Sequence, residues 1–151
     1  MSIAAGPFGS PSNLSMPGAT VIPVLHYADV PAACAWLCRT FGFVERLRIS
    51  DHRVQLAVGE GAVVVAKGSG SSAAWVGDGQ SIMVRVRDVD SHFAQAAGAG
   101  ARIVSEPTTH VYGERQYSAE DLAGRLWTFS QTVANASPRS WGGELVVNSV
   151  A

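Results

Sequence analysis

The stretch VIPVLHYADVPAACAWLCRTFG, residues 21–42, shares its pattern with SIMVRVRDVDSHFAQAAGAG, residues 81–100. Each begins with a run typical of a strand, continues with an aspartate suited to cap a helix, and ends at a glycine that suits a helix terminus. These residues are Asp29 and Gly42 in the first copy and Asp88 and Gly100 in the second. A repeated supersecondary unit predicts two similar modules, since each leaves a sheet face for its twin to complete. We expect the two modules to form a cleft that holds a small molecule.

Three further short strands are expected after each helix. They are 43–49, 53–58 and 62–67 in the first copy, and 101–105, 112–118 and 124–133 in the second. Gly59-Glu60-Gly61 predicts a tight hairpin, and Pro107 is expected to break the chain between two strands. The predicted fold class is therefore α+β, with two β-α-β-β-β modules.

Composition divides the chain into five parts. They are a leader (1–20), module one (21–67), a linker (68–80), module two (81–133) and a tail (134–151). The leader is rich in Gly, Pro and Ser and is expected to be flexible, and the linker is rich in Gly and Ser. The tail ends in a short apolar piece, Glu144 to Val150, which could pair with a sheet edge of this chain or of a partner.

Length and charge exclude several classes of protein. The 151 residues suit one ordinary domain, with 47% hydrophobic and 15% charged residues and a net charge of −1. No basic run supports nucleic-acid binding. No apolar stretch approaches the roughly 18–20 residues that span a membrane, and the N-terminus lacks the pattern of a secretory signal. We therefore expect a cytoplasmic protein with no nucleic-acid or membrane partner.

Two later segments complete a resemblance to a known family. Gly113-Glu-Arg-Gln-Tyr117 is followed by Asp121-Leu-Ala-Gly124, and that turn leads into a strand with alternating aromatics at Trp127 and Phe129. Together with the duplication, these features resemble the glyoxalase/bleomycin-resistance/dioxygenase superfamily, also called the vicinal-oxygen-chelate superfamily. The resemblance covers the domain 21–133. It implies two modules whose mixed sheets curl around a cleft, helices on the convex face, and a homodimer.

The resemblance also implies where a divalent metal would bind in the metal-dependent members. Their ligands are His, Glu or Gln, on the first and last strands of each module. The corresponding positions here are Ile22, Val65, Ser81 and Thr128. Two aliphatic side chains and two hydroxyls do not make such a site, and among the adjacent positions only Gln80 could ligate. We therefore expect no metal and no cofactor.

Alternation along the strands selects the side chains expected to contact a ligand. The predicted ligand-binding residues are His26, Arg53, Gln55, Met83, Arg85, Tyr117 and Thr128. His26 could contact a ligand or act as a base near neutral pH, or simply bond to loop backbone. Arg85 suits a carboxylate or phosphate, or an ion pair with a neighbouring acid. Trp127 and Phe129 are expected on the opposite face, beneath the helices.

The sequence thus favours a protein that binds a small, partly apolar molecule in a cleft without a metal, with Arg85 suited to an anionic group. The alternative is a lyase, isomerase or dioxygenase of the same superfamily with a metal or acid–base groups at non-standard positions. A third hypothesis is an interaction module that docks through its tail. No catalytic residue is assigned, and the sequence leaves the choice between binding and catalysis open.

Overall fold

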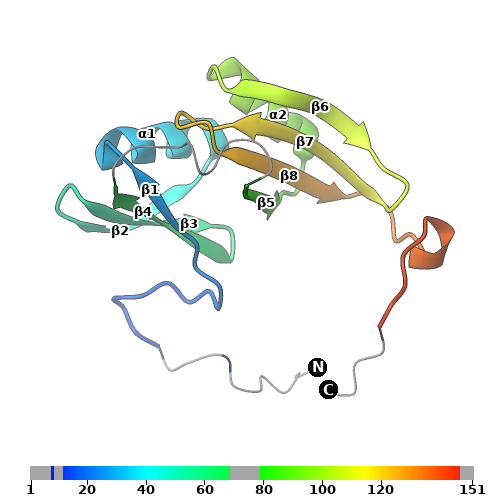
Figure 1. Ribbon diagram of the computed structural model, residues 1–151, viewed down its shortest axis with the longest axis horizontal. Helices are drawn as coiled ribbons and strands as arrows, with labels where there is room; N and C mark the ends of the chain where they lie inside the picture. Colours follow the sequence, from blue (N-terminus) through cyan, green and yellow to red (C-terminus); the bar gives the residue numbers. More distant parts are fainter. Residues whose placement is uncertain (1–7, 9–11, 69–78, 147–151) are drawn as a thin grey trace.

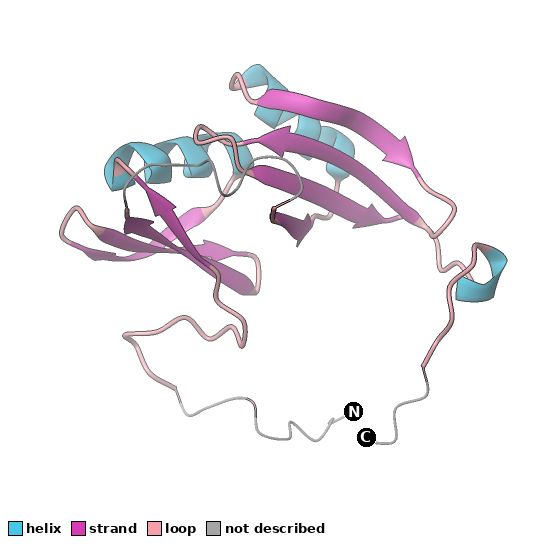
Figure 2. Ribbon diagram, viewed as in Figure 1, coloured by secondary structure: helices cyan, strands magenta, loops and turns pink. Residues whose placement is uncertain are grey.

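A computed structural model describes residue 8, residues 12–68 and residues 79–146 (Figures 1 and 2). Module one contains β1 (Val24–Tyr27), α1 (Val30–Phe41), β2 (Val44–Ile49), β3 (Arg53–Val58) and β4 (Gly61–Lys67). Module two contains β5 (Ser81–Arg85), α2 (Val89–Gly98), β6 (Arg102–Thr109), β7 (Glu114–Glu120) and β8 (Leu126–Thr132), followed by the 3₁₀ helix η2 (Pro138–Ser140). Most of the predicted linker and the end of the tail lie outside the described residues. The predicted α+β class and the two β-α-β-β-β modules are confirmed.

Each module forms a four-stranded mixed sheet with the same topology. The strand orders are β1-β4-β3-β2 and β5-β8-β7-β6, and neither sheet closes into a barrel. In each sheet the first strand pairs in parallel with the last, while the other neighbours are antiparallel. The internal duplication of the sequence is therefore a duplication of strand order.

The predicted break at Pro107 is wrong, because β6 continues through it. The pairing of β6 with β7 shifts register between Ser105 and Thr108, on either side of the proline. β6 is the edge strand of its sheet and has a neighbouring strand on one side only. On its open side there is no strand to accept a hydrogen bond, so a proline without an N–H is tolerated there. The register shift lets the edge strand accommodate Pro107 without ending.

Both helices begin at the capping residues that the sequence indicates, and α1 ends at Gly42 as expected, but α2 ends at Gly98, two residues before Gly100. The side chain of Asp29 accepts a hydrogen bond from the backbone N of Ala32 at 3.0 Å, and that of Asp88 from Ser91 at 3.1 Å. Gly42 ends α1 in the left-handed region, with φ of 80°, where glycine carries no steric penalty. Within the described residues, no helix has the length and apolar character needed to cross a membrane.

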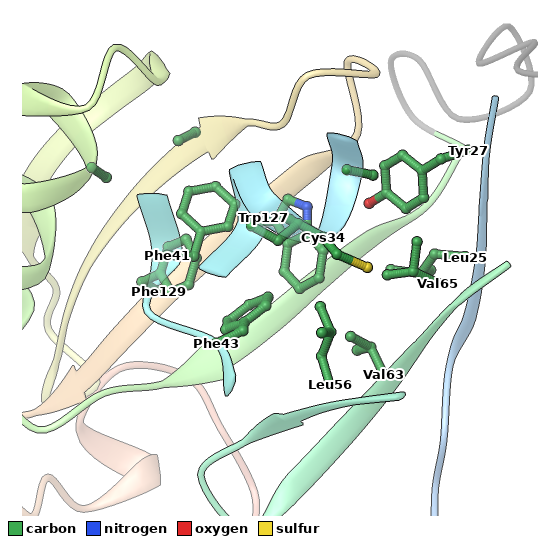
Figure 3. Packing of buried hydrophobic residues seen from close by; sticks show 14 of the residues in the cluster. Leu25, Tyr27, Cys34, Phe41, Phe43, Leu56, Val63, Val65, Trp127 and Phe129 are labelled. Atoms are coloured by element: carbon green, nitrogen blue, oxygen red, sulfur yellow. The ribbon is translucent and has the colours of Figure 1, made fainter. Parts of the chain in front are cut away.

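Both helices lie on the same side of the molecule and contact each other, so the two modules share one core (Figure 1). The ring of Phe41, at the end of α1, lies 4.8 Å from the ring of Phe129 and 5.7 Å from that of Trp127, both on β8 (Figure 3). Trp127 and Phe129 are fully buried, as predicted. Ile82 and Val84 of β5 also pack against this core. Aromatic packing across the module boundary therefore holds the two sheets together.

A buried carboxylate adds a polar connection between the modules. Asp121 accepts hydrogen bonds from the hydroxyl of Tyr27 at 2.7 Å, from Nε1 of Trp127 at 3.0 Å, and from the backbone N of Ala123 and Arg125. The Arg125 guanidinium lies 3.6 Å from Asp121 and 4.7 Å from the centre of the Tyr27 ring. Burial, followed by the charge of Asp121, raises the pKa of Tyr27. The Asp-x-x-Gly turn thus binds β8 of module two to β1 of module one.

His92 on α2 forms a second polar connection between the modules. Its Nε2 lies 2.8 Å from the carbonyl oxygen of Phe41, and its Nδ1 lies 2.6 Å from the hydroxyl of Tyr117. A carbonyl oxygen only accepts, so Nε2 carries the proton, and in the neutral ring Nδ1 accepts from the Tyr117 hydroxyl. Burial lowers the pKa of His92 below its ordinary value of 6.5. The native structure therefore favours the neutral imidazole.

This arrangement predicts a loss of stability in mild acid. The unfolded chain binds a proton at His92 more readily than the folded chain, so this contribution is complete above pH 6.5 and falls as the pH drops through the lower folded pKa. One group changes the free energy of unfolding by at most about 1.4 kcal/mol per pH unit. Urea unfolding between pH 8 and pH 5 measures that slope. The variant His92→Gln is expected to flatten it, and an unchanged slope would contradict the assignment.

Candidate functional site

The structure separates the seven predicted ligand-binding residues into three places. His26, Arg53 and Gln55 lie on the face of module one that points away from the helices, where Arg53 pairs with Ala66 and Ala66 with His26. Met83, Arg85 and Thr128 lie on the equivalent face of module two, and Met83 pairs with Thr128. Tyr117 lies on neither face. The two open faces must therefore be considered separately.

Tyr117, which was predicted to contact a ligand, lies in the core instead. Its side chain is fully buried, and its ring lies 5.2 Å from that of Phe129, on the helix side of β7. Its hydroxyl bonds to His92, and burial raises its pKa. Tyr117 and Ala119 alternate with Gln116 and Ser118 along β7, so core packing fixes the face of each residue. Tyr117 is a core residue.

The face of module one is occupied by the chain's own leader. Nε2 of Gln55 donates to the carbonyl oxygen of Ser15 at 2.9 Å. Arg46 donates from Nη2 to the carbonyl oxygen of Leu14 at 2.9 Å and from Nη1 to Oε1 of Gln55 at 2.5 Å. Gln55 is only 5% exposed. Its amide therefore binds the leader in this structure.

Burial along β4 agrees with this placement. Ala62, Val64 and Ala66 alternate with the core residues of β4 and so point away from the helices, yet all three are buried. Gln55 pairs directly with Val64, which places the leader over this strand. Pro17 in the same leader segment is buried. We expected residues 1–20 to form a flexible leader, but the described segment 12–20 contacts the sheet because Arg46 and Gln55 bind its carbonyl groups.

The face of module two contains an open pocket with a volume of about 740 Å³. Its lining residues are Met83, Arg85, Tyr112, Glu114, Gln116, Ser130 and Trp141. They come from β5, β7, β8, the turn before β7 and the segment after β8. Two of the predicted residues, Met83 and Arg85, therefore lie in one pocket. Thr128 lies beside Met83 on the same face and shares a hydrogen bond of 2.8 Å with Ser118.

A row of hydrogen-bonded side chains forms the floor of this pocket. The hydroxyl of Ser130 donates to Oε1 of Glu114 at 2.5 Å and accepts from Nε2 of Gln116 at 3.0 Å. Nη1 of Arg85 donates to the hydroxyl of Thr132 at 2.5 Å and lies 3.9 Å from Oε1 of Glu114. The hydrogen bonds from Ser130 and Thr132 lower the pKa of Glu114, and the charge of Arg85 lowers it further. The floor of the pocket therefore carries one guanidinium, of Arg85, and one ionised carboxylate, of Glu114.

Apolar side chains form the sides of the pocket. Met83 is 65% exposed on one side, and the rings of Tyr112 and Trp141 lie in contact on the other, with centroids 5.5 Å apart. Alternation from the buried Tyr117 would have assigned Glu114 and Gln116 to this face. No sequence signal indicated Trp141, which lies beyond the repeat.

A second hollow, of about 630 Å³, lies between the two modules. The β3–β4 hairpin of module one and residues 82–85 of β5 line it, together with Val21, Pro23 and Arg87. Met83 and Arg85 line both this hollow and the pocket on module two. These two residues therefore lie where the pocket reaches the module boundary.

The residues at the family's metal positions do not fit a divalent ion. Val65 is fully buried and lies on the core side of β4, while Ser81 and Thr128 lie on the outward face of module two with hydroxyl groups only. Within the described ranges, no three His, Cys, Asp or Glu side chains are placed to share an ion.

Comparison with known proteins identifies the family. The model of the glyoxalase/bleomycin resistance protein/dioxygenase superfamily matches residues 22–129. The chain belongs to this superfamily. Among solved structures it resembles TioX from Micromonospora sp. ML1, with 35% identity, 74% of this chain and 96% of that chain covered, and a TM-score of 0.62. A search of curated proteins found no match.

Two further structures of the superfamily share the fold at lower identity. A glyoxalase/bleomycin resistance protein/dioxygenase from Alicyclobacillus acidocaldarius is 13% identical, with 80% of this chain and 96% of that chain covered and a TM-score of 0.65. A family enzyme from Burkholderia phytofirmans PsJN is 18% identical, with coverages of 80% and 99% and a TM-score of 0.62. The superfamily match ends at residue 129, so Trp141 lies outside it.

Proposed function

We propose that this superfamily member binds a small, partly apolar molecule carrying an anionic group, without a metal, in the pocket on module two. The observation that carries this proposal is the lining of that pocket. Its sides are apolar, and its floor is a row of hydrogen-bonded side chains that includes Arg85. Ligand pockets commonly combine apolar walls with a few polar groups that set orientation. The volume of about 740 Å³ suits a small organic molecule.

Arg85 is the proposed partner of the anionic group. Its side chain is 73% exposed, and one of its five N–H donors goes to Thr132. A planar guanidinium can bind a carboxylate through two parallel hydrogen bonds. Glu114 repels an anion, so the ligand's charged group must approach the side of Arg85 that faces away from Glu114.

We propose binding without a metal because the family's four metal positions supply two aliphatic side chains and two hydroxyls, which do not make a site for a divalent ion. We also infer a homodimer, because superfamily members commonly pair and several large apolar side chains are exposed. Those at least 60% exposed on or beside the strands are Val21, Val44, Met83 and Val111.

Calorimetric titration with naphthalene-2-carboxylate tests the proposed site. We expect saturable binding at one site per chain, and a loss of about fivefold in affinity in Arg85→Ala, because an exposed charge pair contributes modestly. Arg85→Lys should retain part of the affinity, since it keeps the charge but loses the paired geometry. Arg102→Ala is the matched control, because Arg102 pairs with Glu120 on the same sheet but does not line the pocket.

The same titration after dialysis against EDTA tests the metal-free part. We expect an unchanged dissociation constant. Binding that EDTA abolishes and added Zn²⁺ restores would contradict the proposal and favour the metal-dependent alternative. Binding with equal affinity in the wild type and Arg85→Ala would show that the anionic group lies elsewhere.

A further inference from the structure

The segment after β8 is anchored so that it returns to the pocket. The backbone N of Val133 and of Ala134 both donate to the carbonyl oxygen of Gly113, at 2.8 and 3.2 Å. Gly113 has φ of 86°, and a Cβ there would lie 2.2 Å from the carbonyl oxygen of Ala134. Only glycine allows this approach without displacing the segment. The turn before β7 therefore sets the direction in which the chain leaves the sheet.

A single turn of 3₁₀ helix then places Trp141. The backbone N of Trp141 and of Gly143 both donate to the carbonyl oxygen of Pro138, at 3.1 and 2.8 Å. A Cβ on Gly143 would lie 2.8 Å from Cη2 of Trp141 and 3.1 Å from Cβ of Pro138. The indole therefore packs closely on the backbone of its own segment. Figure 1 shows this turn, drawn in orange-red, beside the end of β8.

The indole meets a second fixed ring at the edge of the pocket. The rings of Trp141 and Tyr112 cross at 61°, and Tyr112 stacks on His110 with an angle of 3° and a centroid distance of 5.0 Å. The Tyr112 hydroxyl donates to Oε1 of Gln116 at 3.0 Å, which connects this ring to the floor of the pocket. We call Tyr112 and Trp141 the aromatic wall. Trp141 remains 41% exposed, so part of the indole is open to a ligand.

We propose that Trp141 is a specificity-determining residue that packs against a planar ring of the ligand held on module two. This inference rests on the proposed function, and it adds the chemical class of the ligand: an aromatic ring that bears an anionic group. Aromatic rings attract each other through their quadrupoles in offset or edge-to-face geometry, beyond the effect of buried area. Met83, on the other side of the pocket, has an unbranched and polarisable side chain that adapts to a flat surface. Trp141 lies outside the superfamily match, which ends at residue 129, while Tyr112 lies within it.

Two probes of equal charge and similar size test the preference for a planar ring. They are naphthalene-2-carboxylate and its saturated counterpart, decahydronaphthalene-2-carboxylate, each titrated into the full-length protein by calorimetry. We expect the wild type to bind the aromatic probe about three- to tenfold more tightly. Trp141→Ala should remove that preference, and Trp141→Phe should keep most of it. Leu145→Ala is the matched control, because Leu145 is an exposed apolar residue of the same segment that does not line the pocket.

The outcomes separate this inference from the proposed function. If Arg85→Ala weakens the binding of both probes and Trp141→Ala changes the binding of neither, the pocket binds the ligand but the aromatic wall does not contribute to its selectivity. If Trp141→Ala weakens both probes equally, the indole supplies apolar area only, and the preference for a planar ring is refuted. If neither probe binds the wild type, both proposals fail together.

Discussion

Asp121→Ala is expected to lower the free energy of unfolding by about 3–5 kcal/mol, because it removes one partner of a buried ion pair. The carboxylate accepts from Tyr27, from the indole of Trp127 and from two backbone N–H groups. Its loss leaves these donors buried without their acceptor and removes the counter-charge of the buried Arg125. A change of this size can unfold a domain of ordinary stability.

Urea unfolding followed by tryptophan fluorescence measures this effect. Tyr27→Phe isolates one part of the cluster, since it removes the hydroxyl that donates to Asp121 but keeps the ring beneath Arg125, and we expect a cost of about 1–2 kcal/mol. Asp51→Ala is the control, because Asp51 lies exposed in the turn between β2 and β3. A cost below about 1 kcal/mol for Asp121→Ala would show that the cluster does not secure the fold.

Phe41→Ala is expected to cost about 3–5 kcal/mol and to weaken the coupling between the modules. Phe41 belongs to module one, yet its ring contacts Trp127, Phe129 and His92 of module two. The truncation removes aromatic contacts across the boundary and leaves a cavity that the two sheets cannot close without moving. The loss therefore falls on the boundary between the modules as well as on the core of module one.

Two probes distinguish a loss of coupling from a uniform loss of stability. Far-ultraviolet circular dichroism reports both sheets, while tryptophan fluorescence reports the surroundings of four tryptophans, of which Trp127 is fully buried at the boundary. We expect the two transitions to coincide in the wild type and to separate in Phe41→Ala, because coincident transitions mark two-state unfolding. Coincident transitions in the variant would show that the modules unfold together without this ring. Leu145→Ala, an exposed substitution beyond η2, should shift neither transition by more than about 0.5 kcal/mol.

The fold was readable from the sequence because its strongest signals are local. Asp29 and Asp88 cap helices, and the alternation of Ile82, Val84, Trp127 and Phe129 fixes which face meets the core. These signals recur in both copies, so one supports the other. The bounds of several strands differ by one to four residues, because strand ends depend on pairing partners that lie far along the chain.

The candidate site was harder to predict, because it depends on contacts between distant segments. Tyr117 is polar at one end and was assigned to the cleft, but its ring completes the core, while its neighbour Gln116 faces the pocket. Trp141 reaches the pocket only because Gly113 lets the chain turn back. Gln55 was predicted to contact a ligand, and in the structure its amide binds the leader. Alternation along a strand gives the face of a residue but not what covers that face.

The leader's contact with module one has a practical consequence for anyone who shortens this protein. Removing residues 12–20 would take away the two carbonyl groups that Arg46 and Gln55 hold. It would also remove the chain beside Val64, a buried apolar residue of β4 that pairs with Gln55. Newly exposed apolar surface promotes self-association, and donors that lose their acceptors add to the cost. A shortened chain would therefore aggregate more readily, although every element of the duplicated fold is still present.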